Sequence, residues 1–230
     1  MTEIIGIIGA MDVEVENFKS AMSDIQKVTV SGMDFYSGKM FNKNVVVVKC
    51  GVGKVFAGLA TEILCLKFNA NCIINTGVAG SVSGIKIGET VISSAVCQHD
   101  MDTSALGDLP GLISGINKIY LPADMRLINL AEIASRELGL SYHTGIIASG
   151  DKFVSDALNK ERISSSFTAL CVEMEGGAVG QASYINSTPF LVIRTISDDG
   201  DENHQVEFFK FAKESADKSF KLVSHIIENF

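Results

Sequence analysis

The sequence predicts an α/β fold, a single domain with a mixed, mostly parallel central β-sheet that is partly barrel-like and flanked by helices. Two observations lead to this prediction. Short runs rich in β-branched residues recur along the chain, and each ends in a glycine, serine, threonine or acid. Segments with the apolar period of an amphipathic helix lie between several of these runs. Strands and helices that alternate in this way build a largely parallel sheet.

The predicted strands are continuous apolar runs without polar alternation, which is typical of strands covered on both faces. They lie at 4–8, 44–50, 71–75, 89–96, 144–149, 169–173 and 190–197. The segment 28–40 is expected to form a hairpin that turns at Ser31 and Gly32. Helices are predicted at 53–68, 124–138, 175–186 and roughly 206–228.

The composition favours one globular domain over residues 1–230. Hydrophobic residues make up 47% of the 230 residues and charged residues 20%, and no linker rich in proline, serine or charge divides the chain. The formal net charge is −8 and no block of lysine or arginine occurs, so we expect no nucleic-acid partner.

The sequence predicts a cytoplasmic protein without a membrane span. The apolar N-terminal run is followed at once by acids and lacks a basic leader, and no apolar stretch reaches the length of about 18 residues that a span needs. The five cysteines are an odd number without a C-x-x-C pair, and we expect them to be reduced and structural.

Carboxylates follow the predicted strands. Glu14 comes after the first, Glu173 and Glu175 after the sixth, and Asp198 ends the seventh, close to Arg194. Ligands of α/β sheets bind beyond the carboxyl ends of the strands, where partial desolvation raises the pKa of a carboxyl group toward neutrality. Glycosidic cleavage needs two such groups, one that protonates the leaving group and one that activates water.

Each of these acids also has a plainer interpretation. Glu14 could be an exposed acid in the first turn of a helix, Asp198 could cap a helix or shape a turn, and Glu175 could simply begin a helix. Spacing alone identifies none of them as catalytic.

Two further patterns are weaker. The segment 51–54 has a G-x-G after a strand but lacks the third glycine of a dinucleotide site, and 75–80 is expected to form a tight backbone turn. His99, Asp100 and Asp102 look superficially like metal ligands. The other histidines lack partners at ligand spacing, so we expect a structural or loop role for this segment and no metal.

Seven segments occur in an order that points to one family. They are "IGIIGAMDVEVE" (5–16), "GVGKV" (51–55), "INTGVAG" (74–80), "HDMD" (99–102), "ASGDKFV" (148–154), "VEMEGGAV" (172–179) and "VIRTISDDGD" (192–201). Together they resemble the 5′-methylthioadenosine/S-adenosylhomocysteine nucleosidases of the nucleoside phosphorylase superfamily, nearly from end to end. The resemblance implies a nucleoside phosphorylase-like fold and hydrolysis of an adenine nucleoside without a cofactor.

The resemblance also implies roles for individual residues. Asp198 matches the acid that protonates adenine N7, and Glu14 matches the acid that takes a proton from the attacking water. Arg194 and Ser197 look like supports for the water and for Asp198. The remaining expected contacts are with the ribose (Glu175, Met174), with adenine (Phe153 and the backbone of Val154) and with an apolar slot for the 5′-thio substituent (Met11, Val52, Phe208).

In this family a loop of the neighbouring subunit completes the slot, which would place Leu106 and Pro110 across a homodimer interface. Many relatives carry a serine where this chain has Val78, which cannot make the same hydrogen bond, so we do not expect Val78 to be catalytic. The 103–116 loop also differs from that of many relatives, and the shape of the 5′ slot is therefore open.

Two other functions are alternatives to hydrolysis: phosphorolysis and nucleoside binding without catalysis. A nucleoside phosphorylase would need basic groups at an anion site, but the glycine loops offer only Lys54 and no arginine occurs in 44–125. A non-catalytic nucleoside-binding module would be free to lose the acid pair, but this chain has both Glu14 and Asp198. Methylthioadenosine, S-adenosylhomocysteine, 5′-deoxyadenosine and aminodeoxyfutalosine differ only at the 5′ end, so the preferred substrate and the pathway stay open.

Overall fold

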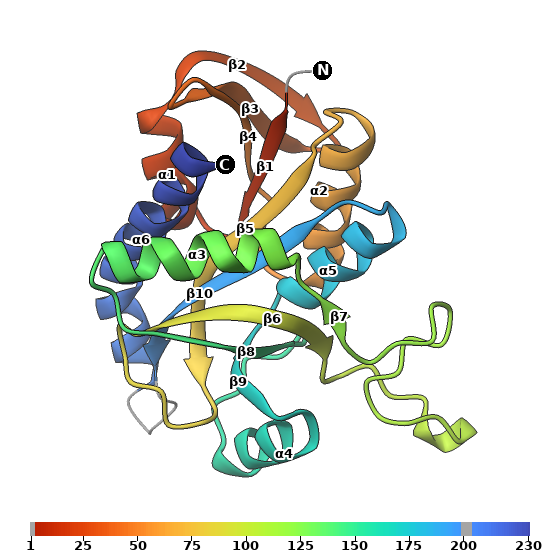
Figure 1. Cartoon of the computed structure of the whole chain (residues 1–230). Helices are drawn as coiled ribbons and strands as arrows, with labels where there is room; N and C mark the ends of the chain where they lie inside the picture. The colour runs from red at the N-terminus through yellow and green to blue at the C-terminus, as the bar shows by residue number, and fades with distance from the viewer. Residues whose placement is uncertain (1–2, 199–203) are drawn as a thin grey trace.

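A computed structural model describes residues 3–198 and 204–230 of the chain, with only the course of the helix given for 204–210 (Figure 1). Within these residues a single α/β domain is built on one mixed sheet of ten strands. The strands are β1 (Ile4–Gly9), β2 (Ser23–Val30), β3 (Met33–Met40), β4 (Lys43–Lys49), β5 (Cys72–Ser81), β6 (Thr90–Gln98), β7 (Leu121–Pro122), β8 (Tyr142–Ser149), β9 (Ala169–Glu173) and β10 (Phe190–Asp198). The α-helices are α1 (Asp12–Ala21), α2 (Lys54–Leu66), α3 (Met125–Glu137), α4 (Ala157–Phe167), α5 (Gly176–Ile185) and α6 (His204–Asn229), and η1 (Ser104–Leu106) is a short 3₁₀ turn.

Half of the sheet closes on itself. The strand order is β10-β6-β8-β9-β5-β1-β4-β3-β2, and β10 also pairs with β5, so the first five strands of this order form a closed barrel. The strands β1, β4, β3 and β2 continue from β5 as an open wing that ends in the β2–β3 hairpin, and β7 pairs with β6. The predicted mixed and partly barrel-like sheet is therefore confirmed.

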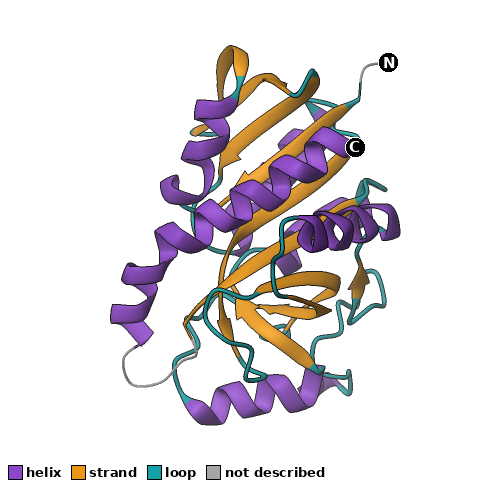
Figure 2. Ribbon diagram, turned by 60° about the vertical axis from the view of Figure 1, so that its left-hand side comes forward, coloured by secondary structure: helices purple, strands orange, loops and turns teal. Residues whose placement is uncertain are grey.

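Helices cover both faces of the sheet. On one side α6 packs on β10 and β5 and contacts α1 and α3, while α2 and α5 pack together on the other side (Figures 1 and 2). The helix α4 lies against β9 and β8 at the barrel end. No helix in the described part of the chain is both long and apolar enough to cross a membrane.

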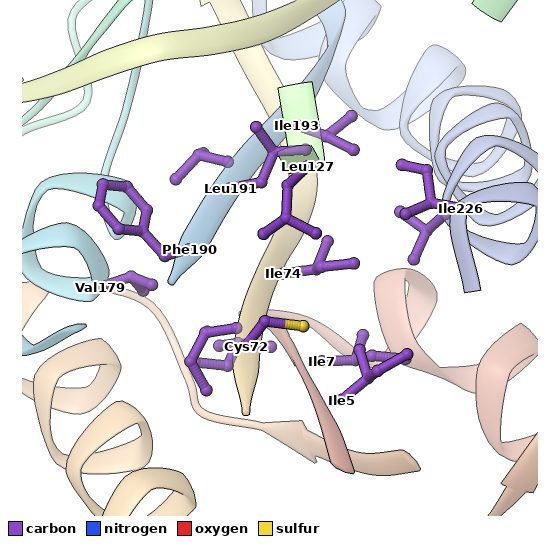
Figure 3. Packing of buried hydrophobic residues seen from close by; sticks show 14 of the residues in the cluster. Ile5, Ile7, Cys72, Ile74, Leu127, Val179, Phe190, Leu191, Ile193 and Ile226 are labelled. Atoms are coloured by element: carbon purple, nitrogen blue, oxygen red, sulfur yellow. The ribbon is translucent and has the colours of Figure 1, made fainter. Parts of the chain in front are cut away.

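The core explains why the β-branched runs become strands. Ile5 and Ile7 of β1, Ile74 of β5, and Leu191 and Ile193 of β10 are at most 1% exposed. Figure 3 shows these side chains packed between the strands and the flanking helices, with Leu127 and Ile226 supplied by α3 and α6. Burial of this apolar surface stabilises the sheet by roughly 25 cal/mol per Å², and it fixes the strand ends that carry the polar residues.

The seven predicted strands and four predicted helices all occur, with bounds shifted by a few residues. The hairpin turn at Ser31 and Gly32 is confirmed, because both residues have positive φ angles, 50° and 78°, as a two-residue hairpin turn requires. The helices α1 and α4, the short turn η1 and the strand β7 have no predicted counterpart. The helix α4 buries only one side chain in each turn, and β7 is two residues long, so neither gives a clear period.

One prediction of local structure is wrong. Residues 75–80 do not turn, because β5 continues to Ser81. The main chain of Thr76 to Gly80 is paired with β10, and Gly80 and Ser81 also pair with β9. Strand pairing on both sides outweighs the freedom of the glycines, which serve the site in another way described below.

Candidate active site

The carboxylates that follow the strands surround one cavity of about 480 Å³. It opens between the ends of β1, β5, β9 and β10 and the loops that follow β4 and β8. Nine residues predicted for the site line it: Met11, Glu14, Val52, Phe153, Val154, Met174, Glu175, Ser197 and Asp198. Residues far apart in the sequence therefore share one space large enough for a nucleoside.

Glu14 is buried at the start of α1. Its residue is 5% exposed, and one carboxylate oxygen accepts hydrogen bonds from the main-chain amides of Ala10 and Met11 at 2.7 and 2.9 Å. The other oxygen accepts from the amide of Val78 at 3.2 Å. Burial raises the pKa of Glu14 above its ordinary value, although Arg194 and the three amides act in the opposite direction. A buried carboxylate held by three donors is suited to accept a proton.

Asp198 ends β10 and is 2% exposed. The hydroxyl of Ser197 lies 3.2 Å from one of its carboxylate oxygens and donates to it. The plainer interpretation, in which this acid only caps a helix or shapes a turn, does not account for its burial at the cavity wall.

Two glycines of β5 make room for these two acids. A Cβ added to Gly77 would lie 2.5 Å from a carboxylate oxygen of Glu14, and one added to Gly80 would lie 3.0 Å from a carboxylate oxygen of Asp198. Neither glycine has a positive φ angle. They are needed for the close approach of a side chain and not for a turn.

Arg194 lies behind the cavity and holds a group of acids together. Its side chain is 1% exposed, and its guanidinium forms an ion pair with Glu173 and lies 3.7 Å from Glu175. It also donates to the side chain of Asn75 at 2.6 Å. Since a buried arginine is favourable only beside negative partners, Arg194 and these acids form one interdependent unit.

Glu175 is the N-cap residue that precedes α5 at the cavity wall. One of its carboxylate oxygens accepts from the amide of Gly53 at 2.9 Å. Burial, followed by the negative charge of Glu173, raises the pKa of Glu175 to about 7, while Arg194 opposes the change. This carboxyl group therefore titrates close to neutral pH.

The rest of the cavity wall is largely apolar. Met11, Val154 and Met174 line it, and Val52 and Phe153 lie at the surface, 51% and 47% exposed. Apolar and aromatic side chains that line a cavity together with a few polar groups are typical of a ligand-binding site.

Three predicted positions, Leu106, Pro110 and Arg194, do not line the cavity. Leu106 is 84% exposed in the segment between β6 and β7 that extends away from the body of the molecule (Figure 1). The side chain of Phe208 lies outside the described residues. Arg194 contacts the acids but does not line the cavity.

The structure adds residues that sequence reasoning did not assign to the site. Glu173 lines the cavity and accepts from the hydroxyl of Ser149, from Arg194, and from the amide of Gly176 at 2.7 Å. Its position at a strand end was visible in the sequence, but its partners come from three separate segments. Lys152 and Val78 also line the cavity, and Val78 serves Glu14 through its main chain, which no side-chain pattern reveals.

Residues 4–228 match the phosphorylase superfamily. The chain belongs to this superfamily. Among its relatives, the 5′-methylthioadenosine/S-adenosylhomocysteine nucleosidase of Halalkalibacterium halodurans is 38% identical over 229 residues, which cover 99% of this chain and 98% of that protein. The resemblance to these nucleosidases that the sequence segments indicated is thereby confirmed.

Solved structures of this superfamily agree closely with the fold. A 5′-methylthioadenosine/S-adenosylhomocysteine nucleosidase from Neisseria meningitidis, in complex with methylthio-immucillin-A, superimposes with a TM-score of 0.96 at 34% identity, covering 99% of this chain and 100% of that one. A futalosine hydrolase mutant of Helicobacter pylori superimposes with a TM-score of 0.95 at 32% identity, and the match covers 100% of both chains.

Proposed function

We propose that this chain hydrolyses the N-glycosidic bond of 5′-methylthioadenosine and S-adenosylhomocysteine, releasing adenine and the 5-thio-substituted ribose. The observation that carries this proposal is the cavity shared by two buried acids, Glu14 from the start of α1 and Asp198 from the end of β10. Glycosidic cleavage needs two such groups. The names of the nucleosidase relatives give the same substrates.

In the proposed reaction the two acids act on opposite sides of the bond. Asp198 gives a proton to adenine N7, so that the electron pair of the breaking C–N bond is accepted by a neutral leaving base. The oxygen of a water molecule forms the new bond to the anomeric carbon, and the proton of that water goes to Glu14. Asp198 must therefore start protonated and Glu14 ionised, and a positioned acid or base of this kind contributes about 10²–10⁴-fold.

The surrounding residues would hold the nucleoside. Glu175 is placed to accept hydrogen bonds from the ribose hydroxyls, because its second oxygen is not used by Gly53. Phe153 would stack on adenine while the main chain of Val154 binds the edge of the base. Met174 would pack beneath the sugar, and the apolar side chains of Met11 and Val52 would take the 5′-thio substituent.

Arg194 and Ser197 would act through the acids. The positive charge of Arg194 opposes the rise of the Glu14 pKa. This favours the ionised form of Glu14, which accepts the proton. Ser197 donates to Asp198 and so orients its carboxyl group. Neither role requires contact with the substrate.

The range of substrates extends to nucleosides that share the adenosine part. 5′-Deoxyadenosine and aminodeoxyfutalosine differ from methylthioadenosine only at the 5′ end, and the similarity to a futalosine hydrolase supports the second of these. Steady-state kinetics on the four nucleosides, followed by adenine release, ranks them. A wild-type chain that binds methylthioadenosine but releases no adenine would contradict hydrolysis and leave a nucleoside-binding module.

Phosphorolysis is the second candidate, because the superfamily takes its name from phosphorylases. A phosphate nucleophile needs cationic groups, but no arginine lines the cavity in the described part of the chain, and Lys54 is held in an ion pair with Asp100 at 2.6 Å. Lys152 does line the cavity, but its side chain is 63% exposed and its ammonium group lies 4.0 Å from Asp156. The carboxylate of Glu14 would also repel phosphate. Turnover measured with and without phosphate separates the two, since strict dependence on phosphate would rule out hydrolysis.

A homodimer is the proposed assembly. The outer face of α2 exposes Val55, Phe56, Leu59 and Leu66, an apolar surface that is unusual for a monomer. Leu106 and Pro110 extend from the body of the molecule and would reach the 5′ slot of a second copy. Light scattering at working concentration gives the mass, and a monomer that retains full activity would contradict this arrangement.

The cytoplasm is the proposed location. All five cysteines are free, and four of them are buried. Burial raises the pKa of Cys50 to about 12, which keeps its thiol protonated and unreactive. Free, inert thiols fit a reducing compartment.

A further inference from the structure

Three charged residues next to the site form a closed ring of interactions. The ammonium group of Lys54 forms an ion pair with Asp100 at 2.6 Å, and the other oxygen of Asp100 accepts from the amide of Asp151 at 2.8 Å. The carboxylate of Asp151 accepts in turn from the amide of Lys54 at 2.8 Å. These residues come from the start of α2, the turn after β6 and the loop after β8. We call Lys54, Asp100 and Asp151 the three-residue ring.

The ring replaces a missing helix cap. The helix α2 begins at Lys54, and the preceding Gly53 has no side chain with which to accept from the first amides. Asp151 supplies that acceptor from a distant loop. Gly53 itself has a φ angle of 105°, and a Cβ at this position would lie 3.1 Å from the carboxylate of Asp151. A glycine here therefore allows both the turn and the approach of the cap.

The ring is more enclosed than an ordinary surface ion pair. The side chains of Lys54 and Asp100 are 17% and 29% exposed, compared with 52% and 39% for Lys27 and Asp34, a pair with the same 2.6 Å separation on the β2–β3 hairpin. Although burial alone would raise it, the hydrogen bonds from Lys54 and Asp151 hold the pKa of Asp100 below its ordinary value. Weaker screening by water makes such a network more effective than the exposed pair.

The ring connects the two loops that would hold the substrate. On one side, Gly53 directly precedes Lys54 in the chain, and its amide donates to Glu175 at 2.9 Å. On the other side, Asp151 lies two residues before Phe153 in the loop that contains the proposed adenine contacts. Movement at Lys54 would therefore reach the ribose contact, and movement at Asp151 would reach the base contact.

We propose that the three-residue ring is a clamp that fixes the ribose-binding and adenine-binding loops relative to each other. Lys54, Asp100 and Asp151 are positioning residues in this proposal and touch no reacting atom. The inference rests on the proposed function, since it assumes that Glu175 and the 149–154 loop contact the nucleoside. It also assigns a positioning role to Asp100 of the 99–102 segment, for which the sequence predicts a structural or loop role.

The test is a double-mutant cycle measured as adenine release from methylthioadenosine. Asp100→Ala and Lys54→Met are each expected to raise KM about tenfold while kcat changes less than about threefold, because the loops lose their relative position and the two acids do not. Lys54→Met also removes the hydrogen bond from Lys54 to Gln98 at 3.0 Å. The double variant is therefore expected to match Lys54→Met, since breaking one ring twice has no further effect. Lys27→Met and Asp34→Ala, at the exposed pair of equal length, are the matched controls and should leave KM unchanged.

A second pair of variants separates positioning from general damage. Asp151→Asn keeps an oxygen that can accept from the amide of Lys54, so its KM should stay within about threefold of wild type, while Asp151→Ala should show the full loss. Calorimetric titration with adenine repeats the comparison without turnover, so the clamp remains testable in a chain that hydrolyses nothing. Thermal unfolding of each variant establishes that the measured protein is folded.

Three results would overturn the clamp. One is a KM for Asp100→Ala within twofold of wild type. Another is additive losses in the Lys54 and Asp100 cycle, which would mean that the two residues act separately. The third is equal KM values for Asp151→Asn and Asp151→Ala, because the retained acceptor would then have no influence on binding.

Discussion

Gly77 lies directly against the carboxylate of Glu14. A Cβ at Gly77 would come within 2.5 Å of one carboxylate oxygen and within 3.3 Å of the guanidinium of Arg194. The strand β5 therefore carries a glycine at the one point where it passes the buried acid, and the amide of the next residue, Val78, donates to the same oxygen. The missing side chain and the donated hydrogen bond together define where Glu14 can lie.

Gly77→Ala is expected to lower kcat by about 10²-fold or more, because the new methyl group displaces the carboxylate that would accept the proton. Steady-state adenine release is the measurement. Gly145→Ala, on β8 and away from the cavity, is the matched control: its Cβ would also meet an atom at 2.5 Å, but that atom is the flexible end of Leu170 on β9. If both variants keep wild-type kcat, Glu14 does not need this space.

Asp198→Asn is expected to reduce kcat by about 10²–10⁴-fold while the affinity for methylthioadenosine changes little, because the amide keeps the shape of the carboxyl group but supplies no proton. Single-turnover adenine release gives the rate, and calorimetry gives the affinity. Turnover near the wild-type value would remove Asp198 from the mechanism.

The pH dependence of kcat/KM follows from Glu14. Burial raises the pKa of this group above its ordinary value of 4.5, and the proposed role needs the ionised form. Activity should therefore fall as the pH drops through the raised pKa, with the midpoint of this acid limb above 4.5, while the need for a protonated Asp198 limits activity at higher pH. Profiles of kcat/KM report such groups in the free enzyme, and Glu175, with a pKa of about 7, should add to the same limb. A flat profile down to pH 4.5 would exclude ionised Glu14 as the proton acceptor.

The sequence was informative where one residue pattern determines one structural feature. Apolar runs such as 190–197 predicted the strands because a strand covered on both faces has no polar alternation. Asp198 could be placed at a strand end for the same reason. The carboxyl ends of parallel strands lie at the same edge of a sheet, so the sequence alone allows the acids to be grouped at one site.

What the sequence did not reveal depends on long-range pairing. The 75–80 segment was expected to turn because of its glycines, but pairing with β10 and β9 extends the strand through it. The partners of Glu173 and the capping of α2 by Asp151 join segments far apart in the chain. Such contacts have no periodic signal and only appear once the fold brings the segments together.

The apolar slot can be tested at Val52, which lines the cavity and is 51% exposed. Val52→Asn is expected to raise KM for methylthioadenosine about tenfold and for adenosine less than about threefold, because only the first places an apolar 5′ group against this side chain. Val28→Asn, at a valine that is 38% exposed on the β2–β3 hairpin, is the control and should change neither value. Equal losses for the two nucleosides would mean that Val52 supports the adenosine part, and the 5′ substituent would then have to be bound by other residues.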